Sequence, residues 1–379
     1  MRSVEIDRAR ILVNGKEERI ISAGMHYFRI HPELWADRIA KAVAFGANAI
    51  ETYIPWNLHE PEQGKFNFSG IADFERFIDL VQAHNLYMIV RPSPYICAEW
   101  DNGGLPAWLN AVPGIKMRRM NEAYLEAVSD YYDVLLPKIQ KKLYTNGGPI
   151  IMLSLENEYG SYCHDKEYLR RMLSFYQKHN INVPIFTNDG HLHFYLSGGA
   201  LPGTMMTMNF GSHSEEAWRN REQWRPDAPD FCMEFWVGWF DHWGEKHHVR
   251  AAGADGSAED ELEKMLEAGA HVNFYMFHGG TNFGFTNGAN GHYFSDYAAT
   301  VSSYDYDSPL SECGDPTEKF YRCQQIIKKH TDNPRIAPIE PTVKIVPPAV
   351  KLNASAGLFD NLKVLSTHFG KAAEPPLME

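Results

Sequence analysis

The sequence predicts an α/β fold, a (β/α)8 TIM barrel with a short Pro-rich C-terminal extension, and three observations lead to this prediction. From about Ile20 to His330, short apolar runs alternate with stretches of helical period, as in repeated strand–helix units on a parallel sheet. Eight of these runs have the length of a strand. No phosphate loop follows the first run, because Gly24-Met25-His26 lacks the GxGxxG pattern of many open doubly wound sheets. Eight strands that alternate with helices close most simply into a barrel, and one barrel of roughly 250 to 400 residues absorbs nearly the whole chain.

The strands are predicted from β-branched or apolar runs, and the helices from apolar residues that recur with a period near 3.6. The eight predicted strands are Ile20–His26, Ala49–Ile54, Tyr87–Arg91, Ile150–Leu155, Pro184–Thr187, Met205–Asn209, Phe231–Glu234 and Val272–Phe277. The predicted helices are Leu34–Phe45, Asp73–His84, Tyr124–Leu143, Lys166–His179, Glu215–Trp224, Glu259–Glu267 and Glu318–His330.

The composition changes after His330, where Pro334 to Pro348 contains five prolines. We therefore predict a catalytic barrel over residues 1–332 and an extension or linker over residues 333–379, directed toward a missing or reduced β domain.

The charge and the cysteines exclude several classes of function. Lys and Arg number 36 against 48 Asp and Glu, for a net charge of −12 with dispersed acidic residues, which disfavours nucleic acid and anionic membranes as partners. The five cysteines form no CxxC pair and are interpreted as reduced thiols.

The N-terminus carries charge where a signal peptide needs an apolar segment, and no uncharged apolar run reaches about 18 residues. A cytoplasmic protein is expected, unless a leader has been removed.

Two glutamates at the ends of apolar strands indicate acid–base chemistry. Glu158 ends the run Leu153-Ser154-Leu155-Glu156-Asn157-Glu158, and Glu234 lies in Cys232-Met233-Glu234-Phe235-Trp236. A carboxylate at the end of a buried strand is costly to desolvate, so it is paired, hydrogen-bonded or poised for a substrate. At a separation of about 5 to 5.5 Å, such a pair would fit a retaining glycosidase.

Catalytic groups of a barrel gather at the C-terminal ends of its strands. Carboxylates, amides and aromatic rings collect there in this sequence, a mixture that suits a sugar better than a phosphate. These residues are Arg29, Tyr53, Trp56, Asn57, Glu99, Trp100, Asn157, Glu158, Glu234, Trp236, Tyr275, Asn282, Tyr304, Asp305 and Tyr306.

Five motifs together resemble the β-galactosidases of glycoside hydrolase family 35, in order and from about Gly24 to His330. They are Ser154-Leu155-Glu156-Asn157-Glu158-Tyr159-Gly160, Met233-Glu234-Phe235-Trp236-Val237-Gly238-Trp239, Arg91-Pro92-Ser93-Pro94-Tyr95-Ile96-Cys97-Ala98-Glu99-Trp100, Met276-Phe277-His278-Gly279-Gly280-Thr281-Asn282-Phe283-Gly284 and Ser303-Tyr304-Asp305-Tyr306-Asp307. The resemblance implies removal of terminal β-linked galactose with retention of configuration, and no metal or organic cofactor.

The resemblance also implies residue roles. Glu158 would be the acid/base and Glu234 the nucleophile, while Tyr275 would orient the nucleophile. The residues that would hold galactose hydroxyls are Tyr53, Ala98, Glu99, Asn157 and Tyr306. Trp236 stands where the family often has Tyr, a difference that concerns the aglycone side.

Several side chains have two readings. Trp236, Trp239 and Trp243 are either core residues or, as we expect, a platform for the aglycone. Glu156 is expected to support the site as a partner of Arg91. Two histidine pairs, His191/His193 and His247/His248, have metal-like spacing but no accompanying carboxylate motif, so no metal site is expected.

The expected activity is that of an exo-β-galactosidase acting on small β-galactosides. An exo-β-glucosaminidase or β-glucosidase on the same scaffold, and a catalytically dead carbohydrate-binding module, are the alternatives. Because family members usually continue into β-sandwich domains, the barrel is expected to expose apolar surface, and a homo-oligomer is one consequence.

Overall fold

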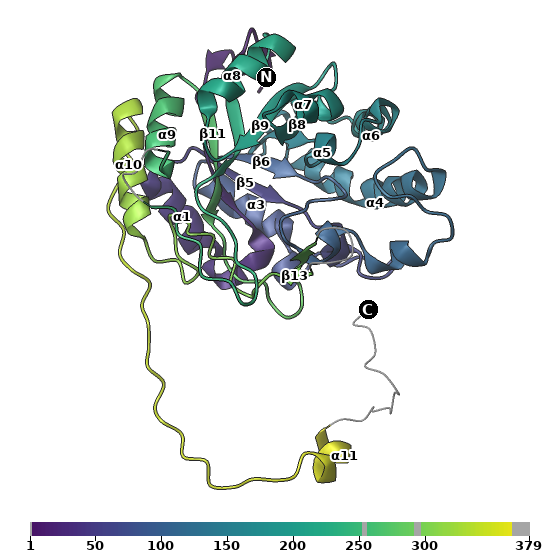
Figure 1. Cartoon of the computed structure of the whole chain (residues 1–379), viewed down its shortest axis with the longest axis vertical. Helices are drawn as coiled ribbons and strands as arrows, with labels where there is room; N and C mark the ends of the chain where they lie inside the picture. The colour runs from purple at the N-terminus through teal and green to yellow at the C-terminus, as the bar shows by residue number, and fades with distance from the viewer. Residues whose placement is uncertain (1, 252–255, 292–296, 366–379) are drawn as a thin grey trace. The chain divides into compact units, whose positions relative to one another are not determined.

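The computed structural model describes residues 2–251, 256–291 and 297–365, and its centre is a closed barrel of eight parallel strands (Figure 1). The strands follow one another around the barrel in chain order, so that β11 closes against β4. They are β4 (Ile21–Met25), β5 (Ala49–Tyr53), β6 (Tyr87–Arg91), β7 (Ile150–Ser154), β8 (Ile185–Gly190), β9 (Met205–Phe210), β10 (Phe231–Trp236) and β11 (His271–His278). The predicted (β/α)8 barrel and all eight predicted strands are confirmed.

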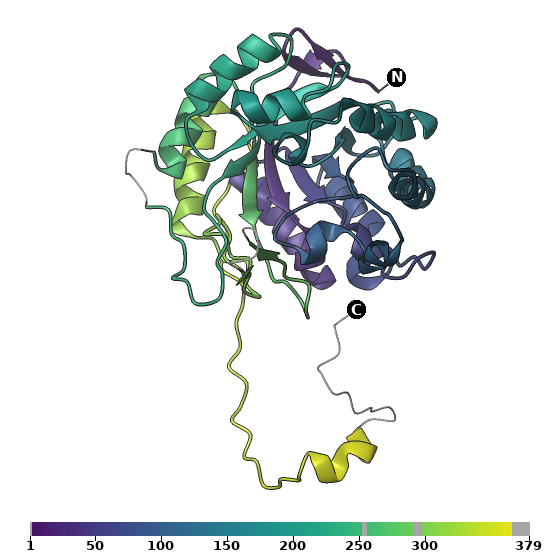
Figure 2. The same ribbon diagram turned by 45° about the vertical axis from the view of Figure 1, so that its right-hand side comes forward.

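Helices surround the barrel (Figure 2), and the seven predicted helices are all present. They are α1 (Trp35–Phe45), α3 (Phe74–Ala83), α4 (Glu122–Lys141), α6 (Lys166–Lys178), α8 (Ser214–Trp224), α9 (Ala258–Glu267) and α10 (Glu318–His330). Several start at a residue whose side-chain oxygen accepts a hydrogen bond from the first turn, such as Asp73 before α3 and Thr317 before α10. The short helices α2 (Trp56–His59), α5 (Tyr159–Tyr162) and α7 (His193–Gly199) were not predicted.

An N-terminal antiparallel sheet, also unpredicted, lies at the end of the barrel opposite β13 (Ala298–Ala299; Figures 1 and 2). Its strands are β1 (Val4–Asp7), β2 (Arg10–Val13) and β3 (Lys16–Glu17). Val4, Ile11 and Val13 are buried in one apolar cluster with side chains from the first residues of the barrel strands, including Ala49 and Phe231. The sheet therefore covers the end of the barrel away from the carboxyl ends of the strands.

The chain divides into two compact units, Met1–Pro341 and Thr342–Glu379. Residues 335–339 belong to the first unit, where the amide of Ala337 donates to the carbonyl of Ala44 at 3.1 Å. Within the second unit, the described part contains one short α-helix, α11 (Leu362–Leu365). No helix among the described residues is long and apolar enough to cross a membrane. The five cysteines all lie within the described residues, and none of them forms a disulfide.

Candidate active site

Glu234 lies near the end of β10 and is held by three side chains. Its Oε1 atom accepts a hydrogen bond from the hydroxyl of Tyr53 at 2.9 Å and forms an ion pair with Nη1 of Arg91 at 2.7 Å. Its Oε2 atom accepts from Nε1 of Trp236 at 3.2 Å. Only 6% of Glu234 is exposed, so these contacts fix one orientation of a nearly buried carboxylate.

Arg91, at the end of β6, connects the glutamate to the rest of the site. Its Nη2 atom donates to Oδ1 of Asn157 at 2.5 Å, and its guanidinium lies 4.1 Å from the centre of the Tyr53 ring. Glu51 faces the same guanidinium at 3.7 Å. Burial raises the pKa of Glu51 to about 7, although the charge of Arg91 opposes that shift. One cation thus positions the carboxylate of Glu234 and the amide of Asn157.

Glu158 follows β7 in a left-handed backbone conformation, with φ 45°. Its amide donates to the carbonyl of Asn188 at 3.0 Å, and its Oε1 atom accepts from Nδ2 of Asn209 at 3.0 Å. Burial and, next, the negative charge of Glu234 raise the pKa of Glu158 to about 8, against the opposing effect of Asn209. The Glu158 carboxyl therefore holds its proton near neutral pH.

Both glutamates line one cavity at the carboxyl ends of the strands. Its wall contains almost every residue that the sequence assigned to the sugar: Tyr53, Ala98, Glu99, Asn157, Glu158, Glu234, Trp236, Trp239, Tyr275 and Tyr306. Cys97 and Phe240 complete the wall. Phe240 was not predicted, because in the sequence it differs little from a core residue. Trp243 lies outside this wall and is 71% exposed.

One side of the cavity is an unusual turn in which Cys97, Ala98 and Glu99 all have positive φ values. Buried Arg29 anchors the turn through a 2.5 Å bond from Nη2 to the carbonyl of Ala98. The hydroxyl of Tyr304 donates to Oε2 of Glu99 at 2.5 Å. Burial raises the pKa of Glu99 to about 7, and both Tyr304 and Arg29 oppose that shift.

Tyr275 and Tyr306 are neighbours in the cavity wall, with ring centres 5.5 Å apart. The hydroxyl of Tyr275 pairs with that of Tyr304 at 3.3 Å. Since the polar contacts of Glu234 described above are with Tyr53, Arg91 and Trp236, the orienting role of Tyr275 stays a prediction.

The predicted partner of Glu156 was wrong. Its carboxylate is bound by Arg118, with Nε to Oε1 at 3.0 Å and Nη2 to Oε2 at 2.8 Å, and not by Arg91. Arg118 also donates to the carbonyl of Asn157 at 2.6 Å. Strand alternation predicted only the face of the strand on which Glu156 lies. Arg118 comes from an irregular segment, and the sequence pattern does not predict where such a segment lies in the fold.

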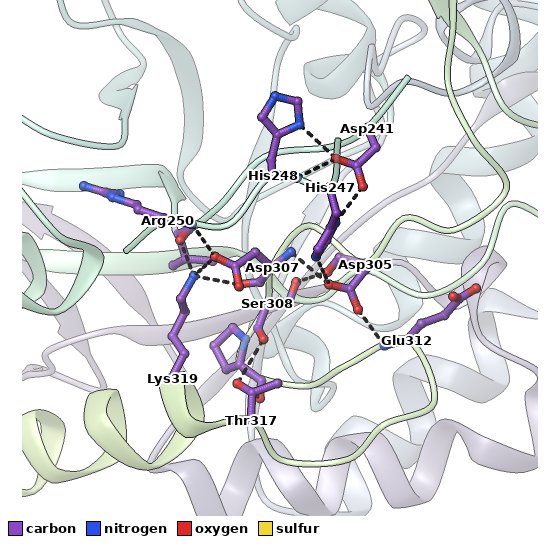
Figure 3. Close-up of polar contacts among 12 residues, drawn as sticks. Asp241, His247, His248, Arg250, Asp305, Asp307, Ser308, Glu312, Thr317 and Lys319 are labelled. Atoms are coloured by element: carbon purple, nitrogen blue, oxygen red, sulfur yellow. Dashed lines mark hydrogen bonds and ion pairs between the residues drawn. The ribbon is translucent and has the colours of Figure 1, made fainter. Parts of the chain in front are cut away.

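No three His, Cys, Asp or Glu side chains in the described ranges are grouped so that they could hold a metal ion. His247 and His248 instead each contact Asp241, at 2.7 and 2.8 Å (Figure 3).

Comparison with known proteins shows the family to which the chain belongs. Residues 10–330 match the sequence profile of Glycosyl hydrolases family 35. The chain belongs to glycosyl hydrolase family 35. The family 35 match begins in β2 and ends with α10, so it covers the whole barrel and every cavity residue named above.

Relatives within family 35 agree over most of the chain. A Bos taurus protein named Beta-galactosidase is 44% identical over 371 residues, which are 96% of this chain and 56% of that protein. A Homo sapiens protein of the same name is 45% identical over 348 residues, covering 90% and 50%. A Mus musculus Beta-galactosidase-1-like protein is 42% identical, covering 93% and 55%. The chain thus spans about half the length of these relatives.

Solved structures share the fold of this family 35 chain at low sequence identity. The exo-beta-1,4-mannosidase Op5Man5 from Opitutaceae bacterium strain TAV5 superposes with a TM-score of 0.59 at 13% identity, covering 86% of this chain and 62% of that one. The beta-galactosidase from the psychrophilic Marinomonas ef1 gives a TM-score of 0.56 at 11% identity, covering 81% and 59%.

Proposed function

We propose that this chain is a retaining exo-β-galactosidase domain that releases terminal non-reducing β-D-galactose from small β-galactosides by double displacement. The observation that carries the proposal is a pair of glutamates lining one cavity, of which Glu158 has a raised pKa and Glu234 is ion-paired with Arg91. Family membership and relatives named as beta-galactosidases support the choice of galactose.

In the first step, the carboxylate of Glu234 attacks the anomeric carbon while Glu158 gives its proton to the glycosidic oxygen, and the bond to the aglycone breaks. Arg91, Tyr53 and Trp236 aim the nucleophile. Because the glycosyl ester of Glu234 is uncharged, the repulsion that helps to raise the pKa of Glu158 then disappears. Glu158, now ionised, takes a proton from water as the water oxygen attacks the anomeric carbon. The ester bond to Glu234 breaks, which releases galactose and restores the Glu234 carboxylate.

The cavity wall supplies the remaining contacts in this proposal. Galactose hydroxyls are held by Tyr53, Ala98, Glu99, Asn157 and Tyr306. Trp236 and Trp239 form the aglycone side. Trp243 contacts only an aglycone that extends beyond the wall, since it lies in solvent.

The direct test is to trap the intermediate with an activated 2-deoxy-2-fluoro-β-galactoside and to map the labelled peptide. We expect the label on Glu234, and a label on any other residue would contradict the assignment. Glu234→Gln should prevent labelling. Glu126→Gln, at an exposed position of α4, is the matched control and should label normally.

A second test separates the acid from the nucleophile. Glu158→Gln should slow the cleavage of a disaccharide far more than that of a dinitrophenyl galactoside, because a good leaving group needs no proton. Equal losses on both substrates would contradict the role of Glu158. Rates on nitrophenyl galactoside, glucoside and glucosaminide separate the sister specificities, and galactose binding without turnover of any glycoside would favour a binding module.

A further inference from the structure

Two segments meet next to the cavity: residues 236–241, which begin at the last residue of β10, and residues 303–309, which follow β13. At Gly238, an added Cβ atom would lie 1.9 Å from the carbonyl oxygen of Tyr306. The two backbones are therefore in direct contact, and no residue with a side chain fits at this point.

The second segment is held in a conformation that it would not adopt alone. Tyr306 and the next residue, Asp307, both have positive φ values, 63° and 50°. Consecutive non-glycine residues in this region persist only where the surrounding structure fixes them. The placement of the Tyr306 ring in the cavity thus depends on what holds Asp307.

Lys319 holds both segments at once. It lies in the first turn of α10, and its side chain is 4% exposed. Its Nζ atom donates to the carbonyl of Val237 at 2.7 Å, to the carbonyl of Asp307 at 2.7 Å and to Oδ2 of Asp307 at 2.5 Å; Figure 3 shows the contacts with Asp307. The three acceptors match the three hydrogens of an ammonium group, and they come from both sides of the contact.

Arg250 adds further hydrogen bonds to the two segments that Lys319 connects. The amide of Arg250 donates to Oδ2 of Asp307 at 2.8 Å (Figure 3). Nη1 of Arg250 donates to the carbonyl of Trp236 at 2.8 Å. The helix that carries Lys319 is itself fixed to the same turn, since the amide of Thr317 donates to the carbonyl of Pro309 at 3.0 Å. Lys319 therefore has no freedom to follow a displaced loop.

We propose that Lys319 is a positioning residue of the reaction: its buried ammonium, without touching the sugar, fixes Tyr306 relative to the segment that carries Trp236 and follows the nucleophile. The inference rests on the proposed function, because its effect on rate requires turnover of a galactoside. Lys329 lies on the same helix but is 60% exposed and pairs with Glu263 at the surface, which makes it a matched control.

The test compares Lys319→Met with Lys329→Met. Active sites are counted with the fluoro-galactoside, and rates are expressed per active site. We expect Lys319→Met to lower kcat/KM by about ten- to a hundredfold, the effect of a misplaced wall residue, and to weaken the binding of isopropyl thio-β-galactoside in calorimetry. Lys319→Met should lower kcat/KM by a smaller factor when the chain already carries Tyr306→Phe, since both changes act on the contact between Tyr306 and the sugar. Lys329→Met should match the parent chain.

A kcat/KM per active site within about twofold of the parent, or losses that add fully with Tyr306→Phe, would overturn the proposal. A purely structural role would lower the number of active sites and the Tm but leave both the rate per site and the thiogalactoside affinity unchanged. If Lys319→Met does not fold, Asp307→Asn tests the same contacts. It keeps the two carbonyl acceptors of Lys319 and removes the negative charge of the third acceptor, the Asp307 carboxylate. If the parent chain turns over no galactoside, the proposed function fails, and the thiogalactoside affinities of the variants still decide the role of Lys319.

Discussion

The proton on Glu158 is the property of a single side chain on which the proposed chemistry depends most. Burial and the charge of Glu234 raise the pKa of Glu158 to about 8, while the amide of Asn209 lowers it. Because the pKa is raised, the acid form is complete well below this value and is lost as the pH rises through it. The alkaline limb of the kcat/KM profile should report this loss.

Asn209→Ala should move that alkaline limb to higher pH. The Asn209 amide stabilises the ionised carboxylate through a 3.0 Å bond, so its removal raises the pKa of Glu158 further. The measurement is the pH dependence of kcat/KM on a nitrophenyl β-galactoside. Asn146→Ala, which changes a surface amide bonded to the carbonyl of Gln140, should leave the profile unchanged. A limb that moves to lower pH would contradict the assignment of the acid.

Glu156→Gln should lower the free energy of unfolding by about 3–5 kcal/mol, because it leaves the buried guanidinium of Arg118 without its countercharge. It should also reduce kcat/KM, since one oxygen of Glu156 accepts from the amide of Asn157 at 2.7 Å, next to Glu158. Urea denaturation and steady-state kinetics check both effects. Glu126→Gln on the exposed side of α4 should change stability by less than about 0.5 kcal/mol.

The two glutamates could be found from the sequence because each lies at or just beyond the end of an apolar strand, and strand ends converge in a barrel. Their supports could not be found in the same way. Arg118 comes from an irregular segment 38 residues before Glu156, and Lys319 looks like any other lysine of an amphipathic helix. The sequence pattern indicates which charged residues are buried. The partner of a buried charge depends on the tertiary structure, which the pattern does not contain.

Among the elements, the barrel strands were the most predictable, because strands buried on both faces give continuous apolar runs. The bounds of β6 and α10 agree with the prediction to the residue. The N-terminal sheet was missed because its strands are short and carry charged residues. One signal was available: Asn14-Gly15 forms the turn between β2 and β3, with φ values of 54° and 75° that favour this pair.

Ile11→Ala in β2 should destabilise the chain by about 2–5 kcal/mol without changing KM. Ile11 is fully buried against the first residues of the barrel strands, at the end away from the cavity, so its loss leaves a hole in the core but moves no cavity residue. Urea unfolding gives the free energy of unfolding, and kinetics measured well below the Tm give KM. Lys16→Ala, on exposed β3, should do neither. A raised KM in Ile11→Ala would show that the sheet also influences the site.

Across the whole molecule, the residues that line the cavity lie between positions 53 and 306, inside the first compact unit. The second unit exposes many apolar side chains, among them Val343, Val346 and Leu352. We propose that it supports self-association of this chain, as such exposed surfaces commonly do. The sequence indicated a change of character after His330, and the placement of a boundary after residue 332 stays a prediction.

Truncation after Pro341 should leave kcat/KM within about twofold of the full chain and abolish any self-association seen by light scattering. Truncation after Asp332 should instead lower the free energy of unfolding by several kcal/mol, since it removes bonds between residues 335–339 and the barrel. Among them are those from Arg335 to the carbonyl of His84 at 3.0 Å and from Gln324 to the carbonyl of Ala337 at 2.9 Å, and Ile336 and Ile339 are lost from the core with them. Equal stability of the two truncated chains would show that the barrel already ends at residue 332, while loss of activity in the longer one would show that the second unit contributes to the site.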